Sequence, residues 1–153
     1  MQLVRMSKDE FQEFVMGGEE DYAQERSRNL ETLVEDERKV ARQQYAEIAR
    51  DFETGRVRAE LILVAGNRVG FMVYSYDEKK RLAYLLYIRI FEAYRRRGYA
   101  RDALGLLEKD TIRLGADKIG LNVFGDNESA KRLYEKSGYR FAFHGMHKKI
   151  KKG

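Results

Sequence analysis

The chain has 153 residues, enough to enclose one hydrophobic core and too few for two ordinary domains, so we expect a single domain over residues 1–153. It contains no cysteine, which excludes disulfides, thiolate nucleophiles and zinc–thiolate sites. No apolar run is long enough to span a membrane, and no signal-peptide pattern stands at the start. We therefore expect a cytoplasmic protein that does not bind membranes.

The formal net charge of +5 raises the question of a nucleic-acid partner. Over most of the chain the arginines alternate with acids, as they do on ordinary solvated helices. The exceptions are Arg95–Arg97 and a C-terminal group made up of Lys148, Lys149, Lys151 and Lys152. Because the first cluster also fits a phosphate site, we expect no nucleic-acid partner. An RNA-associated adaptor that uses the lysine tail is the weakest of three hypotheses.

Residues 1–58 are predicted to form a short strand and two helices. The strand covers Leu3–Met6, and Ser7 with Glu10 has the spacing of a capping box at the start of the first helix. Gly17-Gly18 interrupts that helix or ends it. One apolar face at helical spacing predicts the second helix, and its residues are Leu33, Val40, Ala41, Tyr45, Ile48 and Phe52.

Residues 59–150 alternate between strand and helix patterns. Gly66-Asn67 predicts a hairpin turn, because both residues tolerate positive φ. Gly115 and Gly138 follow helical repeats and predict helix ends. The predicted strands are 61–65, 69–76, 82–91, 118–124, and a closing hairpin of 139–143 and 146–150. One predicted helix follows the strand 82–91 and ends near residue 114, and another covers residues 127–137. This order indicates an α+β domain on a mixed sheet, with about four helices and six to seven strands.

The loop after the strand 82–91 predicts an anion site. It reads Tyr94-Arg95-Arg96-Arg97-Gly98-Tyr99-Ala100 and leads into a helix. The first N–H groups of a helix have no partner inside it, and the helix dipole adds about half a positive charge there. Gly98 lets the backbone approach a bulky phosphate, and the small Ala100 leaves room. A solvated charge run is the alternative for the arginines, but their place at a helix start favours a pyrophosphate.

Three motifs occur in order along the chain. They are Arg95-x-x-Gly98-x-Ala100, then Asn127-x-x-Ala130-x-x-Leu133-Tyr134-x-x-x-Gly138-Tyr139, and then Met146-x-Lys148-x-Ile150. Together they resemble the acetyl-coenzyme A loop, the following helix and the closing strand of the GNAT-type N-acetyltransferases. The resemblance covers about residues 59–150, whereas residues 1–58 fit the family by helical content alone.

The resemblance implies a GNAT-type sheet in which two central parallel strands, 82–91 and 118–124, splay apart. Main-chain groups of the first strand would bind the pantetheine arm like a replacement strand, and one N–H would polarise the thioester carbonyl. The candidates are the main chains of Ile88 and Ile90, with Arg89 between them. A buried strand is the alternative for both isoleucines, and it is compatible with this role.

The resemblance also assigns the remaining coenzyme contacts, namely Arg95, Arg96, Arg97, Gly98, Tyr99, Ala100, Asn127, Ala130 and Tyr134. Asn127 is expected to cap its helix as well. Tyr134 matches the tyrosine with which the family protonates the departing thiolate. A phenol with a pKa of about 10 keeps its proton at neutral pH, which suits that role. A core aromatic is the alternative for Tyr134.

The sequence leaves the general base open. Many family members carry a carboxylate on the strand before the phosphate loop, where this chain has Tyr87 and Arg89, and Glu92 lies just beyond. Further acids lie on the N-terminal helices, where the family places acceptor specificity. A water chain to one of them is a hypothesis, with solvated surface as the alternative; they are Glu19, Glu20, Asp21 and Glu35.

The sequence therefore predicts an N-acetyltransferase that moves the acetyl group of acetyl-coenzyme A to a primary amine by direct attack. A non-catalytic coenzyme A-binding module of the same fold is the second hypothesis, motivated by Tyr87 where an acid is common. Acid-rich N-terminal helices favour a cationic small-molecule or peptide amine as acceptor. Frequent dimers in the family allow a homodimer. His144 and His147 are too few for a zinc site, so we expect no metal.

Overall fold

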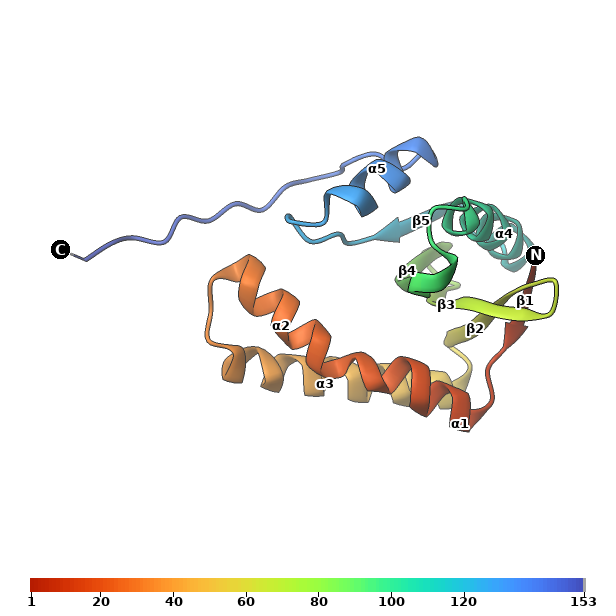
Figure 1. Ribbon diagram of the computed structural model, residues 1–153, viewed down its shortest axis with the longest axis horizontal. Coiled ribbons are helices and arrows are strands. Elements are labelled where there is room, and N and C mark those ends of the chain that lie inside the picture. The colour runs from red at the N-terminus through yellow and green to blue at the C-terminus, as the bar shows by residue number, and fades with distance from the viewer. Residues whose placement is uncertain (153) are drawn as a thin grey trace.

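A five-stranded mixed sheet forms the centre of the protein in the computed structural model, which describes residues 1–152 (Figure 1). The strands lie side by side in chain order; the first four pair antiparallel, and the fifth runs parallel to the fourth. The predicted α+β class and mixed sheet are confirmed. The strands are β1 (Gln2–Arg5), β2 (Val57–Val64), β3 (Asn67–Asp77), β4 (Leu82–Ile90) and β5 (Lys118–Leu121).

Helices cover both faces of the sheet, with α2 and α3 on one side and α4 and α5 on the other (Figure 1). The first helix continues through Gly17-Gly18 after two irregular turns, so the glycines interrupt it and do not end it. No helix among residues 1–152 is long and apolar enough to cross a membrane. The helices are α1 (Lys8–Glu10), α2 (Glu19–Leu30), α3 (Val34–Thr54), α4 (Tyr99–Leu114) and α5 (Glu128–Lys136).

Two hydrophobic clusters lie on opposite faces of the sheet. Because successive side chains of a strand point to opposite faces, β3 contributes Phe71 and Val73 to the cluster under α3, and Met72 and Tyr74 to the cluster under α4. All four side chains are buried. Both faces of β3 are therefore covered, as expected for the middle strand of a three-layer domain.

The N-terminal helices follow the sequence signals except at one position. Glu10 N–H donates to Ser7 Oγ at 3.1 Å and Ser7 N–H donates to Glu10 Oε1 at 2.9 Å, which confirms the capping box. Leu33, predicted on the apolar face of the second helix, instead stands before α3 and is 73% exposed. The reason is that α3 begins only at Val34, so Leu33 belongs to the turn that follows α2.

The hairpin between β2 and β3 is confirmed, with its turn one residue earlier than predicted. Val64 pairs with Asn67, so the two central residues are Ala65 and Gly66, with φ of 50° and 81°. Positive φ at both central residues is the geometry that matches the twist of the flanking strands. Asn67 therefore belongs to β3. β2 also begins at Val57, four residues before the predicted start.

An irregularity in β4 opens the sheet on one side. Val73 pairs with Tyr87 while Tyr74 pairs with Leu85, so Leu86 is an extra residue that forms a β-bulge. The parallel pairing with β5 covers only Leu82 to Leu85, and β5 ends at Leu121 while β4 continues to Ile90. A bulge bends its strand and increases its twist, which separates β4 from the chain that follows β5. The splayed pair implied by the resemblance is present.

The predicted closing hairpin of residues 139–143 and 146–150 is wrong for this structure. Residues 139–152 contain no strand, and the sheet has five strands where six to seven were predicted. The segment leaves the body after α5 and extends outward, shown in blue in Figure 1. The physical reason is the early end of β5: the chain turns away after Leu121, so only four residues of its edge could template another strand.

Candidate active site

Beyond the bulge, some main-chain N–H groups of β4 point away from β3, where no neighbouring strand within residues 1–152 pairs with them. Phe91 N–H donates to the Val69 carbonyl at 2.8 Å, so this N–H points toward β3. N–H groups alternate in direction along a strand, and those of Ile88 and Ile90 therefore point to the opposite side, where β5 has already ended. Arg95 Nε donates to the Ile90 carbonyl at 2.9 Å from that same side. The two predicted main chains thus border open space.

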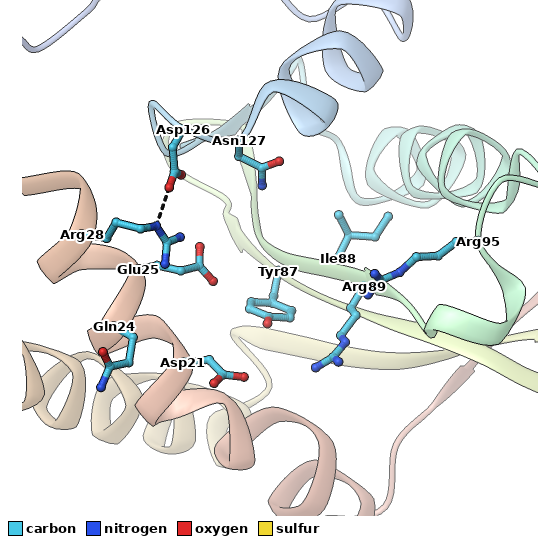
Figure 2. A pocket seen from close by; sticks show the side chains of 10 residues that line it. All are labelled: Asp21, Gln24, Glu25, Arg28, Tyr87, Ile88, Arg89, Arg95, Asp126 and Asn127. Carbon is cyan, nitrogen blue, oxygen red and sulfur yellow. Dashed lines mark hydrogen bonds and ion pairs between the residues drawn. The ribbon is translucent and has the colours of Figure 1, made fainter.

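A cavity of about 560 Å³ lies beside this edge (Figure 2). One wall comes from α2 and the opposite wall from β4, with the loop after β5 closing one end. Four predicted residues, Ile88, Arg89, Arg95 and Asn127, are brought together here. The full lining is Asp21, Gln24, Glu25, Arg28, Tyr87, Ile88, Arg89, Arg95, Asp126 and Asn127.

The basic loop has the geometry of an anion-binding helix start. Arg96 and Gly98 adopt positive φ, 65° and 77°, and Gly98 stands directly before α4. Within residues 1–152, no acceptor is found for the N–H groups of residues 96–101. Tyr99 and Ala100 are half-buried at the first turn. Free amides at the positive end of a helix of sixteen residues favour a negatively charged group.

The three arginines of this loop differ in their surroundings. Arg95 lines the cavity and is held by the Ile90 carbonyl. The Arg97 guanidinium lies over the Tyr94 ring, 5.9 Å from its centroid, and both Arg96 and Arg97 are exposed outside the cavity lining. The structure therefore brings Arg95 into the site and leaves the other two at its solvent side, beside the free amides.

Asn127 caps α5, as predicted. Its Oδ1 accepts from Ala130 N–H at 3.1 Å, and the side chain also lines the cavity. The preceding residue, Asp126, is tied to α2: Asn29 Nδ2 donates to Asp126 Oδ1 at 3.1 Å, and Asp126 N–H donates to Asn29 Oδ1 at 3.1 Å. Arg28 pairs with the other oxygen of Asp126, shown as the dashed line in Figure 2. These contacts hold the end of α2 against the loop that carries Asn127.

Tyr134 is half-buried in the cluster beneath α4 and does not line the cavity. Its ring meets the Tyr139 ring edge to face, with 5.7 Å between centroids. Burial raises the pKa of Tyr134 above its usual value of 10. The hydroxyl is thus neutral at physiological pH.

Of the four acids proposed on the N-terminal helices, only Asp21 reaches the cavity. Glu20 forms a salt bridge with Arg38 at 2.8 Å, and Glu19 and Glu35 are outside the lining. Sequence reasoning missed Glu25, which lies on the cavity wall one turn after Asp21. Its signal was the polar run at helical spacing, Asp21, Gln24, Glu25 and Arg28, which shares one face of α2.

The surroundings of Glu25 disfavour the charged form of its carboxyl. It is half-buried, and burial raises the pKa of its carboxyl, with the neighbouring Asp126 and Asp21 adding to the rise and Arg28 opposing it. A carboxyl whose charged form is disfavoured binds a proton more strongly than an ordinary one. Such a group is a candidate base in a cleft.

Tyr87 separates this cavity from a smaller one of about 210 Å³, which shares Asp21, Tyr87 and Arg89 with it. The Tyr87 ring stacks on Phe71 at 5.5 Å, and burial raises the pKa of its hydroxyl. The position where the family often has a carboxylate is therefore occupied by a neutral aromatic side chain. Among residues 1–152, no group of three or more His, Cys, Asp or Glu side chains is placed to hold a metal ion.

Comparison with known proteins identifies the family. The model of the acetyltransferase (GNAT) family matches residues 19–139, most of the chain. The chain belongs to the GNAT family of acetyltransferases. YycN of Bacillus subtilis (strain 168), an uncharacterized N-acetyltransferase, is 28% identical over an alignment of 152 positions that covers 97% of each chain. The YycN crystal structure covers 99% of both chains with a TM-score of 0.90 and 26% identity.

A coenzyme complex shares the fold. Aminoglycoside N-acetyltransferase AAC(6')-Iy in complex with CoA has a TM-score of 0.56 and 14% identity, over 72% of this chain and 87% of the other. At this identity, the similarity between the two chains shows a shared fold alone. Family membership confirms the predicted enzyme class, an acyltransferase of the N-acetyltransferase type.

Proposed function

We propose that this GNAT acetyltransferase moves the acetyl group of acetyl-coenzyme A to a primary amine by direct attack, without a covalent enzyme intermediate. The observation that carries the proposal is the free edge of β4 beyond the bulge, where the N–H groups of Ile88 and Ile90 point away from β3 and Ile88 lines the cavity. An extended pantetheine arm has amide groups that can pair with such an edge in the way an added strand does.

The residues around this edge fit the rest of the coenzyme. The free amides of residues 96–101 and the α4 start suit a pyrophosphate, and Arg95 adds a fixed cation at the end of β4. Asn127 stands at the end of the cavity that the loop after β5 closes, and its side chain lines the cavity. When bound, acetyl-coenzyme A supplies the activated acetyl group, and an outward N–H of β4 is a donor for the negative charge that develops on the thioester oxygen.

The far wall of the cavity favours a cationic acceptor. Asp21, Glu25 and Asp126 contribute carboxyl groups to it, and Arg28 is already paired with Asp126. An amine that enters as an ammonium ion is attracted by the remaining acids. Before it attacks, it must lose a proton, and the free base is rare at neutral pH because the pKa of an alkylamine is about 10.4. A base beside the acceptor is therefore required.

We assign that role to Glu25, with Tyr134 as the proton donor. The ammonium proton passes to the Glu25 carboxylate, directly or through one water, and the amine nitrogen forms a bond to the carbonyl carbon. The carbon–sulfur bond breaks, and the thiolate takes the Tyr134 phenol proton. The nitrogen loses its second proton as the amide forms, and that proton returns to the Tyr134 phenolate. The raised pKa of Glu25 makes its carboxylate a better base than an ordinary one. Holding both reactants in one cleft supplies a further part of the acceleration.

The test is thiol release from acetyl-coenzyme A across a panel of polyamines, aminoglycosides and peptide amines, with neutral alcohols as a comparison. We expect turnover with cationic amines. In Glu25→Gln, kcat should fall by about 10²–10⁴-fold, the usual contribution of a general base. The pH at which the rate rises should also change. Glu20→Gln is the matched control, because Glu20 lies on the same helix and pairs with Arg38 outside the cavity.

Three outcomes would each contradict a different part of the proposal. Calorimetric binding of coenzyme A without thiol release for any amine would point to a non-catalytic binding module. Turnover that Glu25→Gln leaves unchanged would retain the acetyl transfer and remove Glu25 as the base. No binding of coenzyme A to the folded chain would remove the coenzyme site itself.

A further inference from the structure

The smaller cavity of about 210 Å³ has no part in the reaction described above. It is an aromatic pocket, lined by the rings of Phe14, Phe71, Tyr87 and Phe91. These rings contact each other, with 5.9 Å between the centroids of Phe14 and Phe71 and 5.7 Å between those of Phe14 and Phe91. An apolar cavity of about 150 Å³ in another protein is large enough to bind benzene. The aromatic pocket therefore has the size and the lining to hold a phenyl ring.

The bulge in β4 determines which side chains reach the aromatic pocket. Because Leu86 is an extra residue, Leu86 and Tyr87 both pack on the α3 side of the sheet, and the alternation continues from there. Phe91 therefore lies on the same side, and Arg89 stands between Tyr87 and Phe91, opposite Phe71 of β3. The feature that leaves the β4 edge open thus also places two rings and one cation beside the pocket.

The helical segment before α2 leaves room for the aromatic pocket because its turns are irregular. A wide π-helical turn covers Phe11–Val15, and a tight 3₁₀ turn covers Met16–Gly18. Turns of the first kind are often found at functional sites. Gly17 and Gly18 line the pocket without a side chain to fill it, and a Cβ on Gly17 would meet nothing within 4 Å. Glycines weaken a helix, so the space that they leave open explains their presence here.

Two opposite charges lie where the aromatic pocket meets the larger cavity. Asp21 from α2 and Arg89 from β4 line both cavities, together with Tyr87. Figure 2 shows the two charged side chains on either side of the Tyr87 ring. Both are exposed, and neither forms an ion pair within residues 1–152. A ligand that carries both an ammonium group and a carboxylate can pair with each of them.

We propose that the acceptor is an α-amino acid with an aromatic side chain, and that this side chain enters the aromatic pocket. The inference rests on the proposed acetyl transfer and names its acceptor. Asp21 and Glu25, one turn apart on α2, receive the ammonium group, and Arg89 binds the carboxylate. The ring of the amino acid packs against Phe14 and Phe91. The products are the N-acetyl amino acid, coenzyme A and one proton.

The charges favour this acceptor over other amines. A polyamine or an aminoglycoside has no carboxylate and would bring a further cation toward Arg89, which repels it. A peptide amine has an amide in place of the carboxylate on its first α-carbon. Glu13 also lines the aromatic pocket and disfavours an acidic side chain there. An aromatic amino acid pairs with both charges and fills the pocket as well.

Calorimetric titration of the full chain, with and without coenzyme A, tests the assignment independently of catalysis. L-phenylalanine should bind. L-alanine should bind at least about tenfold more weakly, because it leaves the pocket unfilled. L-phenylalaninamide should bind about 10–100-fold more weakly, because it offers Arg89 no charged partner. Absence of phenylalanine binding, or equal affinity for phenylalanine and either of the other two ligands, would overturn the proposal.

Two substitutions separate the pocket from the carboxylate site. Gly17→Leu adds a side chain at the wall of the pocket and should lower the ratio of phenylalanine to alanine affinity at least about tenfold. Gly105→Leu is the matched control, because a Cβ at this α4 position also meets nothing within 4 Å. Arg89→Gln should bring the affinities for phenylalanine and its amide together. Unchanged ratios in both Gly17→Leu and Arg89→Gln would overturn the proposal.

Thiol release distinguishes failure of this inference from failure of the proposed function. Turnover of other cationic amines, with neither binding nor turnover of phenylalanine, would retain the acetyl transfer and overturn the amino acid as acceptor. Binding of phenylalanine with the expected preferences, but without thiol release from any amine, would support the pocket as an amino acid site and contradict the proposed function.

Discussion

The Tyr134 hydroxyl is proposed to protonate the leaving thiolate, and its environment keeps the proton in place. Because burial alone raises the pKa of Tyr134, the phenol is fully neutral at physiological pH. We expect Tyr134→Phe to lower kcat by about 10²–10⁴-fold and to change the apparent KM for acetyl-coenzyme A little, since the ring still packs. Steady-state thiol release measures both constants.

Tyr139 is the matched control for this change. Its ring contacts Tyr134, and burial, with a smaller contribution from Tyr134, raises the pKa of its hydroxyl to about 12. Tyr139→Phe removes the same atom from the neighbouring ring and should retain most of the activity. Equal losses in the two variants would indicate a packing effect. Full turnover in Tyr134→Phe would remove the acid role.

The burial of Glu60 should make the stability of the folded protein depend on pH. It is half-buried on β2; Tyr74 Oη donates to its Oε1 at 3.4 Å, and its Oε2 is buried without a partner within residues 1–152. Burial is the main cause that raises the pKa of Glu60 above the usual 4.5, and Asp110 adds to it. Above pH 4.5 the native state therefore holds more protons than the unfolded state, and stability falls as pH rises toward the native pKa.

Glu60→Gln should remove this dependence. The amide has the same shape and no charge to desolvate, so the variant should be more stable than the parent at neutral pH and equal to it in acid. Urea unfolding monitored by circular dichroism across the acid to neutral range gives both curves. A parent whose stability is the same on both sides of that range would contradict the prediction.

At the scale of elements, the bulge in β4 and the glycine opposite its far end determine the open edge. Gly70 pairs with Ile90, and a Cβ on Gly70 would lie 2.1 Å from the Arg89 carbonyl oxygen. Main chain cannot give way as a flexible side chain can. Gly70→Ala should therefore displace β4 at Ile90, next to the residues Ile88 and Arg89 that line the cavity. We expect lower stability, by about 1–3 kcal/mol as for other overpacked sites, and weaker coenzyme binding.

Gly105 offers the opposite result for the same substitution. It lies inside α4, and a Cβ there meets nothing within 4 Å. Gly105→Ala should stabilise the protein by about 0.5–1 kcal/mol, because alanine loses less backbone entropy in a helix. Urea midpoints and calorimetric titration with coenzyme A separate the two variants. Equal binding by Gly70→Ala and the parent would show that the edge tolerates displacement.

Elements with local signals were predictable from the sequence. The capping box of Ser7 and Glu10, the Asn127 cap and the Gly115 helix end each depend on neighbouring residues, and all three are present. The bulge at Leu86 was not predictable, because no residue type marks it and it arises from the register with β3. The family resemblance implied the splayed strands, and the bulge supplies their physical cause.

The closing hairpin, which was predicted wrongly, depends on a pairing between segments that are distant in the chain. Residues 139–150 have an alternating apolar pattern typical of strands, but a strand needs a neighbour, and the early end of β5 leaves little edge in the same chain. Glu25 was missed for a related reason. Its spacing from Asp21 was visible, but only the packing of α2 opposite β4 shows which helix face borders the cavity.

The cleft itself depends on a contact between residues 97 positions apart. Asn29 on α2 exchanges two hydrogen bonds with Asp126, one to its side chain and one from its N–H, and so positions the loop that carries Asn127. Asn29→Ala removes both bonds and a third one, from Asn29 Nδ2 to the Glu25 carbonyl oxygen at 2.8 Å, and keeps the exposed pair of Arg28 with Asp126. Because α2 forms one wall of the acceptor space and the loop closes its end, the variant should lose alignment as well as stability.

We expect kcat/KM for the amine in Asn29→Ala to fall by up to about 10²-fold, the effect of a displacement near 1 Å on reacting groups. Stability should fall by about 1.5–4 kcal/mol, as for three hydrogen bonds. Glu20→Gln on the same helix, which does not contact the loop, should keep the parent kcat/KM. If Asn29→Ala lost stability to the expected extent and kept full kcat/KM, the link between α2 and the loop would support folding only, and the cleft would hold its shape through β4 and α5 alone.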